Sequence, residues 1–190
     1  MFSFVTAASL LLSSAVMAWD VPPEAADLGA GVHIHIEREV NASAAQAWAV
    51  LAHDYVDVAD WSTSTTQSRA MTAAEVPAGL TPDPAAPVPG RVQVSEKFGE
   101  ITETLVMYDE AGRSFRFVGG GLPGFLPYAG NTQSVVDLGD GRSRIAFDIY
   151  FVPRGPAKLL KGRFEKKFEA GLGRALDEAV VYIETGEPVS

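Results

Sequence analysis

The C-terminal part of the chain carries the clearest pattern of apolar and polar positions. Between Ala157 and Thr185, apolar residues recur at intervals of three and four, at Leu160, Phe164, Phe168, Leu172, Leu176, Val180 and Ile183. This spacing places them on one stripe of an amphipathic helix about seven turns long. Pro156 suits its first turn and Gly186 its C-terminal cap. A helix of this length is expected to lie across a whole sheet.

Alternating patterns predict the strands of that sheet. Val32–Val40 alternates with period two, and its apolar positions share one face. Further strands are predicted at Thr63–Met71, Arg91–Phe98, Ile101–Tyr108, Ser114–Val118, Asn131–Leu138 and Arg142–Val152. Glycine-containing turns at 109–112 and 139–141 join neighbouring strands as hairpins, which makes the sheet antiparallel.

Short helices and loops fill the remaining chain. Ser43 and Gln46 are spaced as a capping box, so a helix is predicted over 44–52, with a second short helix over 56–61. Thr72–Pro89, with five prolines, and Gly119–Gly130 lack periodicity and are predicted loops, either of which could be a lid. Gly171 and Gly173 inside the last helix indicate either close packing on the sheet or room for a ligand.

The N-terminus resembles an export signal. Residues 2–18 are uncharged, and Val16 and Ala18 occupy the two positions that a signal peptidase reads. We therefore predict a cleaved signal peptide over 1–18, an extended lead-in over 19–31 and one domain over 32–190. The protein is then exported, periplasmic or extracellular, with no stable membrane span after cleavage; an anchor or an ordinary helix remain alternatives.

Composition restricts the possible partners. The 190 residues include 47% hydrophobic side chains, enough for a core, and no cysteine, which excludes disulfides and thiolate chemistry. The net charge of −9 argues against nucleic acid as a partner. Protein partners and oligomeric state are left open.

The ordered set of elements is similar to the helix-grip fold of the START-like (SRPBCC) superfamily, and most similar to its polyketide cyclase/dehydrase-like branch. The segments that carry the resemblance are VNASAAQAWAVLAHDYVDVADW, GEITETLVMYDEAGRSFRFV, GDGRSRIAFDIYFVPRG and FEKKFEAGLGRALDEAVVYIETGEP. It implies an α+β fold: a curved antiparallel sheet of about six or seven strands around a long C-terminal helix, with two short helices after the first strand. It also implies a cavity for a small hydrophobic ligand between sheet and helix.

The resemblance to plant abscisic-acid receptors of the same fold points to individual residues. It implies that Glu103, Phe115, Phe117, Thr132, Ser134, Asp148 and Tyr150 face the cavity. Trp61, Val92, Val94, Phe168 and Leu172 are further expected lining residues. The receptors' gate and latch loops have no clear counterpart, so hormone reception is not implied.

Two acidic residues are candidates for chemistry. Glu103 alternates with Ile101, Leu105 and Met107, so it is expected inside, where it either orients a ligand or transfers protons; a solvent-facing position is the third possibility. Strand alternation places Asp148 outside, whereas the resemblance places it inside, and both remain open.

The histidines at positions 33 and 35 share one face of the first strand. Such a pair can bind zinc, but its alternation against apolar neighbours favours a solvated outer surface, and no metal or other cofactor is expected.

Three functions fit the sequence. The first is a carrier or binding protein for a lipid, polyketide-like or aromatic molecule. The second is a cyclase/dehydratase-type enzyme that uses Glu103 with Asp148 or Tyr150 as acid and base. The third is a partner-binding module whose cavity is filled by side chains.

Overall fold

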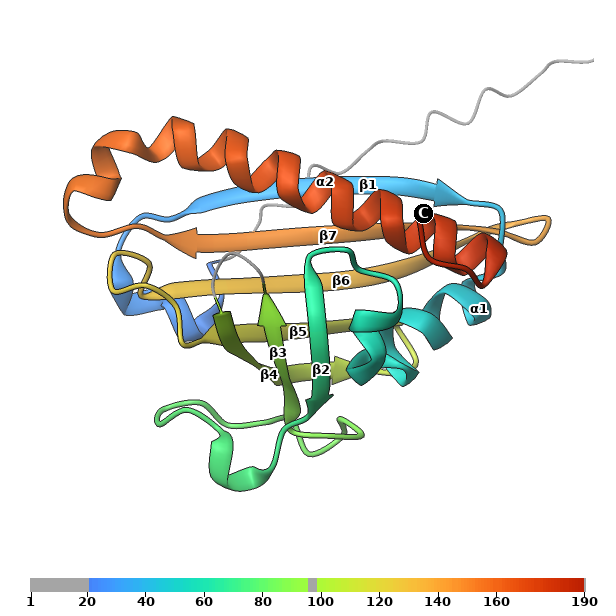
Figure 1. Cartoon of the computed structure of the whole chain (residues 1–190), viewed down its shortest axis with the longest axis horizontal. Coiled ribbons are helices and arrows are strands. Elements are labelled where there is room, and N and C mark those ends of the chain that lie inside the picture. Colours follow the sequence, from blue (N-terminus) through green and yellow to red (C-terminus); the bar gives the residue numbers. More distant parts are fainter. Residues whose placement is uncertain (1–20, 96–98, 190) are drawn as a thin grey trace, which may run out of the picture.

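Seven antiparallel strands form one curved sheet in the order β1-β7-β6-β5-β4-β3-β2. We describe residues 21–95 and 99–189 of a computed structural model; the predicted signal peptide, residues 1–18, lies outside them. The strands are β1 (Val32–Val40), β2 (Thr65–Ala70), β3 (Gly90–Ser95), β4 (Gly99–Asp109), β5 (Ser114–Gly120), β6 (Tyr128–Gly139) and β7 (Arg142–Val152). Figure 1 shows β2 and β3 turned steeply away from β1 and β7, so that the sheet curls.

The long C-terminal helix α2 (Lys161–Thr185) follows a 3-10 turn, η5 (Gly155–Leu160). Gly186 ends it at φ 74°, and the Gly186 N–H donates to the Tyr182 carbonyl oxygen at 2.8 Å. The predicted α+β helix-grip fold is thereby confirmed, with seven strands, a long last helix and short helices after the first strand.

Helix α2 bridges the two edges of the curled sheet. On one side Arg38 of β1 pairs with Asp177 of α2, Nε to Oδ1, at 2.8 Å. On the other side Glu178 accepts hydrogen bonds from the backbone N–H of Thr63, at 3.0 Å, and from its hydroxyl. Thr63 lies just before β2, so the helix connects both ends of the strand order. Along its length α2 follows β1 (Figure 1).

The short helices after β1 close one end of the sheet. Ser43 and Gln46 form the predicted capping box at the start of α1 (Ala44–Trp48). A π-helical turn, η2 (Ala49–His53), and a 3-10 helix, η3 (Tyr55–Asp60), follow. Their buried residues, including Trp48 and Tyr55, join the main hydrophobic core with Phe115, Phe147 and other apolar residues of the sheet.

The two faces of the sheet have different covers. We call the face toward α1 and α2 the inner face. The outer face carries a second cluster built from Ala25, Val118, Tyr128 and Val152. The sequence predicts an extended lead-in over 19–31. Ala25 instead belongs to a 3-10 helix, η1 (Pro23–Leu28), and this helix packs on the sheet.

The proline-rich loop over 72–89 lies along β4 and is hydrogen-bonded to it. It contains the short 3-10 helix η4 (Ala73–Glu75). The Asp83 N–H donates to the Leu105 carbonyl oxygen at 2.8 Å, and Asp83 Oδ2 accepts from the Tyr108 N–H at 2.9 Å. These bonds place this loop beside β4, and its residues Ala86 and Val88 pack against the main hydrophobic core. None of the helices within residues 21–95 and 99–189 has the apolar length that a transmembrane span needs.

Candidate functional site

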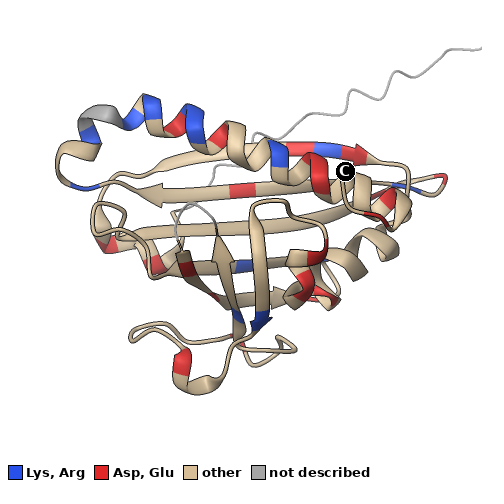
Figure 2. Cartoon of the chain, in the orientation of Figure 1, with Lys and Arg blue, Asp and Glu red and all other residues tan. Residues whose placement is uncertain are grey.

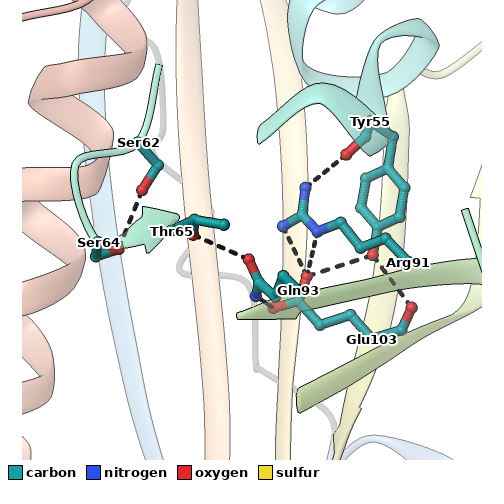
Figure 3. A network of polar contacts seen from close by, with 7 residues as sticks. All are labelled: Tyr55, Ser62, Ser64, Thr65, Arg91, Gln93 and Glu103. Atoms are coloured by element: carbon teal, nitrogen blue, oxygen red, sulfur yellow. Dashed lines mark hydrogen bonds and ion pairs between the residues drawn. The ribbon is translucent and has the colours of Figure 1, made fainter. Parts of the chain in front are cut away.

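A buried ion pair lies on the inner face between β3 and β4. Arg91 and Glu103 are directly opposite in the antiparallel register. Arg91 Nη2 lies 2.6 Å and Nε 2.7 Å from Glu103 Oε2, and the two side chains are only 7% and 9% exposed. Gln93, two residues along β3, donates from Nε2 to the other oxygen, Oε1, at 2.8 Å. Both carboxylate oxygens of Glu103 therefore have donors (Figure 3).

Tyr55 of η3 covers this pair. Arg91 Nη1 donates to the Tyr55 carbonyl oxygen at 2.6 Å, and the guanidinium carbon lies 4.2 Å from the centre of the Tyr55 ring. The Tyr55 hydroxyl lies 3.4 Å from the carbonyl oxygen and 3.5 Å from Oε2 of Glu103. Burial raises the pKa of the Tyr55 phenol well above its usual value. The positive charge of Arg91 lowers this pKa and the negative charge of Glu103 raises it, but burial has the largest effect. The phenol is therefore a hydrogen-bond donor at neutral pH.

Aromatic rings and a further amide extend the site along the inner face. The rings of Tyr55 and Phe117 lie 6.1 Å apart, and Phe117 is stacked at 6.4 Å from Phe115. Phe117 pairs in register with Asn131 of β6, whose side chain therefore shares this face. Asn131 is 6% exposed, and its side-chain oxygen has no hydrogen-bond partner within the described residues.

Several residues that were predicted to line a cavity lie on the inner face or in the core beneath it. Glu103, Phe115 and Phe117 are buried on the inner face, and Trp61 belongs to the same core. On α2, Phe168 and Leu172 are half-buried against this core, and the Phe168 ring stacks on that of Phe151 at 4.6 Å.

Other predicted lining residues lie on the outer face, which corrects the expectation. Val92 pairs in register with Thr102, so Val92 and Val94 point away from Glu103, and Arg91 and Gln93 point toward it. Thr132 and Ser134 likewise alternate with Asn131 and Gln133, which pair with inner residues of β7. On β3 the inner positions are polar, so apolar residues do not mark the inner face there. On β6 the resemblance implies the opposite face from the one that the register gives.

Asp148 and Tyr150 are also on the outer face. They pair in register with Thr132 and Gly130, and the Tyr150 hydroxyl accepts from the Gly31 N–H at 2.9 Å. The predicted pairing of Glu103 with Asp148 or Tyr150 is therefore wrong, because the sheet separates them.

Asp148 instead contacts the histidines of β1. His35 Nδ1 lies 2.6 Å and His33 Nε2 3.3 Å from Asp148 Oδ1. Burial lowers the pKa of His35, but Asp148 and then Glu37 outweigh it and raise the pKa above its usual 6.5. Among residues 21–95 and 99–189, no group of three or more histidine, cysteine or acidic side chains is arranged to hold a metal ion.

Four residues of the site were missed by reading the sequence: Tyr55, Arg91, Gln93 and Asn131. On β3 the apolar Val92 and Val94 suggest the wrong face, and on β6 the receptor resemblance points to Thr132 and Ser134, so Arg91, Gln93 and Asn131 are overlooked. One signal was available: a carboxylate expected inside needs a cation nearby, and Arg91 begins the strand that precedes Glu103.

Comparisons with known proteins agree with this architecture. The family model described as "Polyketide cyclase / dehydrase and lipid transport" matches residues 31–180, so the chain belongs to this family. A search of curated proteins gave no match.

Solved structures share the fold at low identity. A START superfamily protein from Mycobacterium smegmatis is 15% identical with a TM-score of 0.58, covering 81% of this chain and 99% of its own. The Zhui aromatase/cyclase from Streptomyces sp. R1128 is 15% identical with a TM-score of 0.60, covering 84% and 100%. Truncated norcoclaurine synthase from Thalictrum flavum is 20% identical with a TM-score of 0.55, covering 81% and 93%.

Proposed function

We propose that the protein binds a small, largely apolar and uncharged molecule between the inner face of the sheet and α2. The observation that carries this proposal is the neutralised ion pair of Arg91 and Glu103 within an aromatic surface. An apolar site with a few fixed polar groups is the usual design of a small-molecule pocket.

Residual exposure on the inner face supports this location. Phe117, Glu103, Gln93 and Asn131 retain 6–8% exposure, whereas Leu105 and Phe115 on the same face retain none. The half-buried Phe168 and Leu172 of α2 add apolar surface on the side of the helix.

The charge balance selects the class of ligand. Arg91 and Glu103 already compensate each other, so a carboxylate or ammonium on the ligand would be buried without a counter-ion. An uncompensated buried charge costs several kcal/mol. The unpartnered Asn131 oxygen can instead accept a hydrogen bond from a hydroxyl or an amine N–H.

Carriage is favoured over proton-transfer catalysis. Both oxygens of Glu103 are already occupied by Arg91 and Gln93, which suits a positioning role. The acid/base pair that the cyclase hypothesis needed is not formed, since Asp148 and Tyr150 face the other way.

The proposal is tested with two probes that share one skeleton, neutral 2-naphthol and ionised 2-naphthoate, titrated at neutral pH by calorimetry. We expect naphthol to bind at least about tenfold more tightly, because the naphthoate carboxylate would be buried without a counter-ion. A tenfold difference in Kd corresponds to about 1.4 kcal/mol. Glu103→Gln leaves Arg91 uncompensated and should reverse the preference. The matched control Glu39→Gln removes an exposed carboxylate, 56% accessible, and should leave it unchanged. Equal affinity for both probes, or no saturable binding of either, would contradict the proposal.

A further inference from the structure

One end of this acidic protein is strongly basic. Residues 154–167, here called the basic segment, hold six of the chain's 15 lysines and arginines and a single acidic residue. The segment therefore carries a net charge of +5, and because the whole chain carries −9, the rest carries −14. In Figure 2 the positions of lysine and arginine, in blue, gather along the first half of α2 and the turn before it.

The cations of the basic segment are exposed and unneutralised. They are Arg154, Lys158, Lys161, Arg163, Lys166 and Lys167. No carboxylate of the described residues lies within ion-pair distance of any of them; Lys161 Nζ donates to the Gly31 carbonyl oxygen at 3.3 Å. Clustered like charges repel one another, so an anionic surface that compensates them would be attracted to this segment.

Arginines elsewhere are arranged differently. Six of them pair with carboxylates: Arg38 with Asp177, Arg69 with Glu75, Arg91 with Glu103, Arg116 with Glu24, Arg142 with Glu39 and Arg144 with Glu37. The basic segment therefore differs from the rest of the surface, where positive and negative side chains are interspersed and paired.

An aromatic side chain projects beside these cations. Phe125 is 43% exposed, and its ring lies 5.7 Å from that of Phe164 in the first turn of α2. A shallow, open hollow on α2 is lined by Gly162, Arg163, Lys166, Lys167 and Ala170. Cations around an exposed aromatic ring fit a lipid surface, where the ring enters the headgroup region and the cations meet anionic headgroups.

We propose that the basic segment and Phe125 dock the protein on an anionic phospholipid bilayer. A planar bilayer can contact this end of the molecule alone. A long nucleic acid would extend past the basic segment and be repelled by the acidic rest of the protein. The proposal is independent of whether the inner face binds a ligand.

Vesicle co-sedimentation of the full chain tests it. Vesicles of phosphatidylcholine with about 30% phosphatidylglycerol should bind the protein at about 0.1 M salt and release it at about 0.5 M, because salt screens charge. Pure phosphatidylcholine vesicles should bind it weakly. The triple variant Arg163→Gln, Lys166→Gln, Lys167→Gln should lower the affinity about a hundredfold, at about fivefold for each charge.

A matched triple variant controls for net charge. Arg69→Gln, Arg142→Gln, Arg144→Gln removes the same charge from exposed, paired positions and should leave binding within about twofold. Phe125→Ser should weaken binding to anionic vesicles severalfold without affecting binding to a short DNA duplex. Equal losses in both triple variants, equal binding to neutral vesicles, or tighter binding to DNA than to anionic vesicles would each overturn the proposal.

Discussion

The buried pair between Arg91 and Glu103 makes a strong prediction for stability. Glu103→Gln keeps the shape of the side chain but removes the charge that faces the guanidinium at 2.6 Å. Both side chains are more than nine-tenths buried, so the remaining cation would lack compensation. Breaking a buried pair from one side typically costs 3–5 kcal/mol, and because Gln retains an acceptor oxygen we expect about 3 kcal/mol.

This cost is large enough to measure by urea and thermal unfolding. About 3 kcal/mol corresponds to a loss of roughly 10 °C in Tm for a domain of this size. Glu39→Gln, whose pairs with Arg142 and Arg144 are exposed, should cost less than about 1 kcal/mol. Replacing both partners, as Arg91→Met with Glu103→Leu, should recover most of the loss, because no charge remains buried.

A loss in Glu103→Gln no larger than that in Glu39→Gln would show that the buried guanidinium does not need its counter-charge. A double variant as unstable as the single one would show that the cost does not arise from an uncompensated charge.

Three further predictions concern α2 and the outer face. Gly171→Ala should stabilise the protein by about 1 kcal/mol in urea unfolding, because an added Cβ meets no atom within 4 Å; a loss of stability would mean that this space is needed. Thr63→Val removes the hydroxyl that donates to buried Glu178, so it should cost about 1–2 kcal/mol of stability and speed amide hydrogen exchange in α2. Unchanged exchange would mean that this hydrogen bond does not hold α2 in place. Because the pKa of His35 is raised, its contribution is complete below about pH 6.5 and is lost as pH rises through the folded pKa. Asp148→Asn should therefore lose more stability at about pH 5.5 than at about pH 8.5, and an equal loss at both would contradict that coupling.

The elements of the fold could be predicted because their signals are local. The stripe that ends at Ile183 has helical spacing, the Ser43 capping box lies at the start of α1, and glycine turns separate the hairpin strands. Gly171 shows the limit: the sequence allowed either close packing or open space at this helix position, and the structure leaves it open, since an added Cβ would meet nothing.

The faces of the strands were harder to predict, because burial here does not follow hydrophobicity. Arg91 and Gln93 are buried on the inner face, while the neighbouring Val92 is buried on the outer face. A β-bulge between Leu105 and Met107 also interrupts the alternation of β4, so Met107 pairs with Arg116 and does not share the face of Leu105. Such reversals depend on register and on what covers each face, which residues far away in sequence decide.

The lead-in shows the same dependence on distant partners. Ala25 is fully buried against Val118 and Val152, and Glu24 pairs with Arg116 at 3.1 Å. Nothing in the local composition of this segment indicates that the outer face of the sheet needs a cover.

The central claim, that the inner face beneath α2 receives an uncharged apolar molecule, is tested most directly by an NMR titration with 2-naphthol. We predict saturable shifts at the Arg91 Nε–H and at the side-chain amides of Gln93 and Asn131, with little change at His35 on the outer face. Shifts confined to the outer face, or none that saturate, would contradict the account.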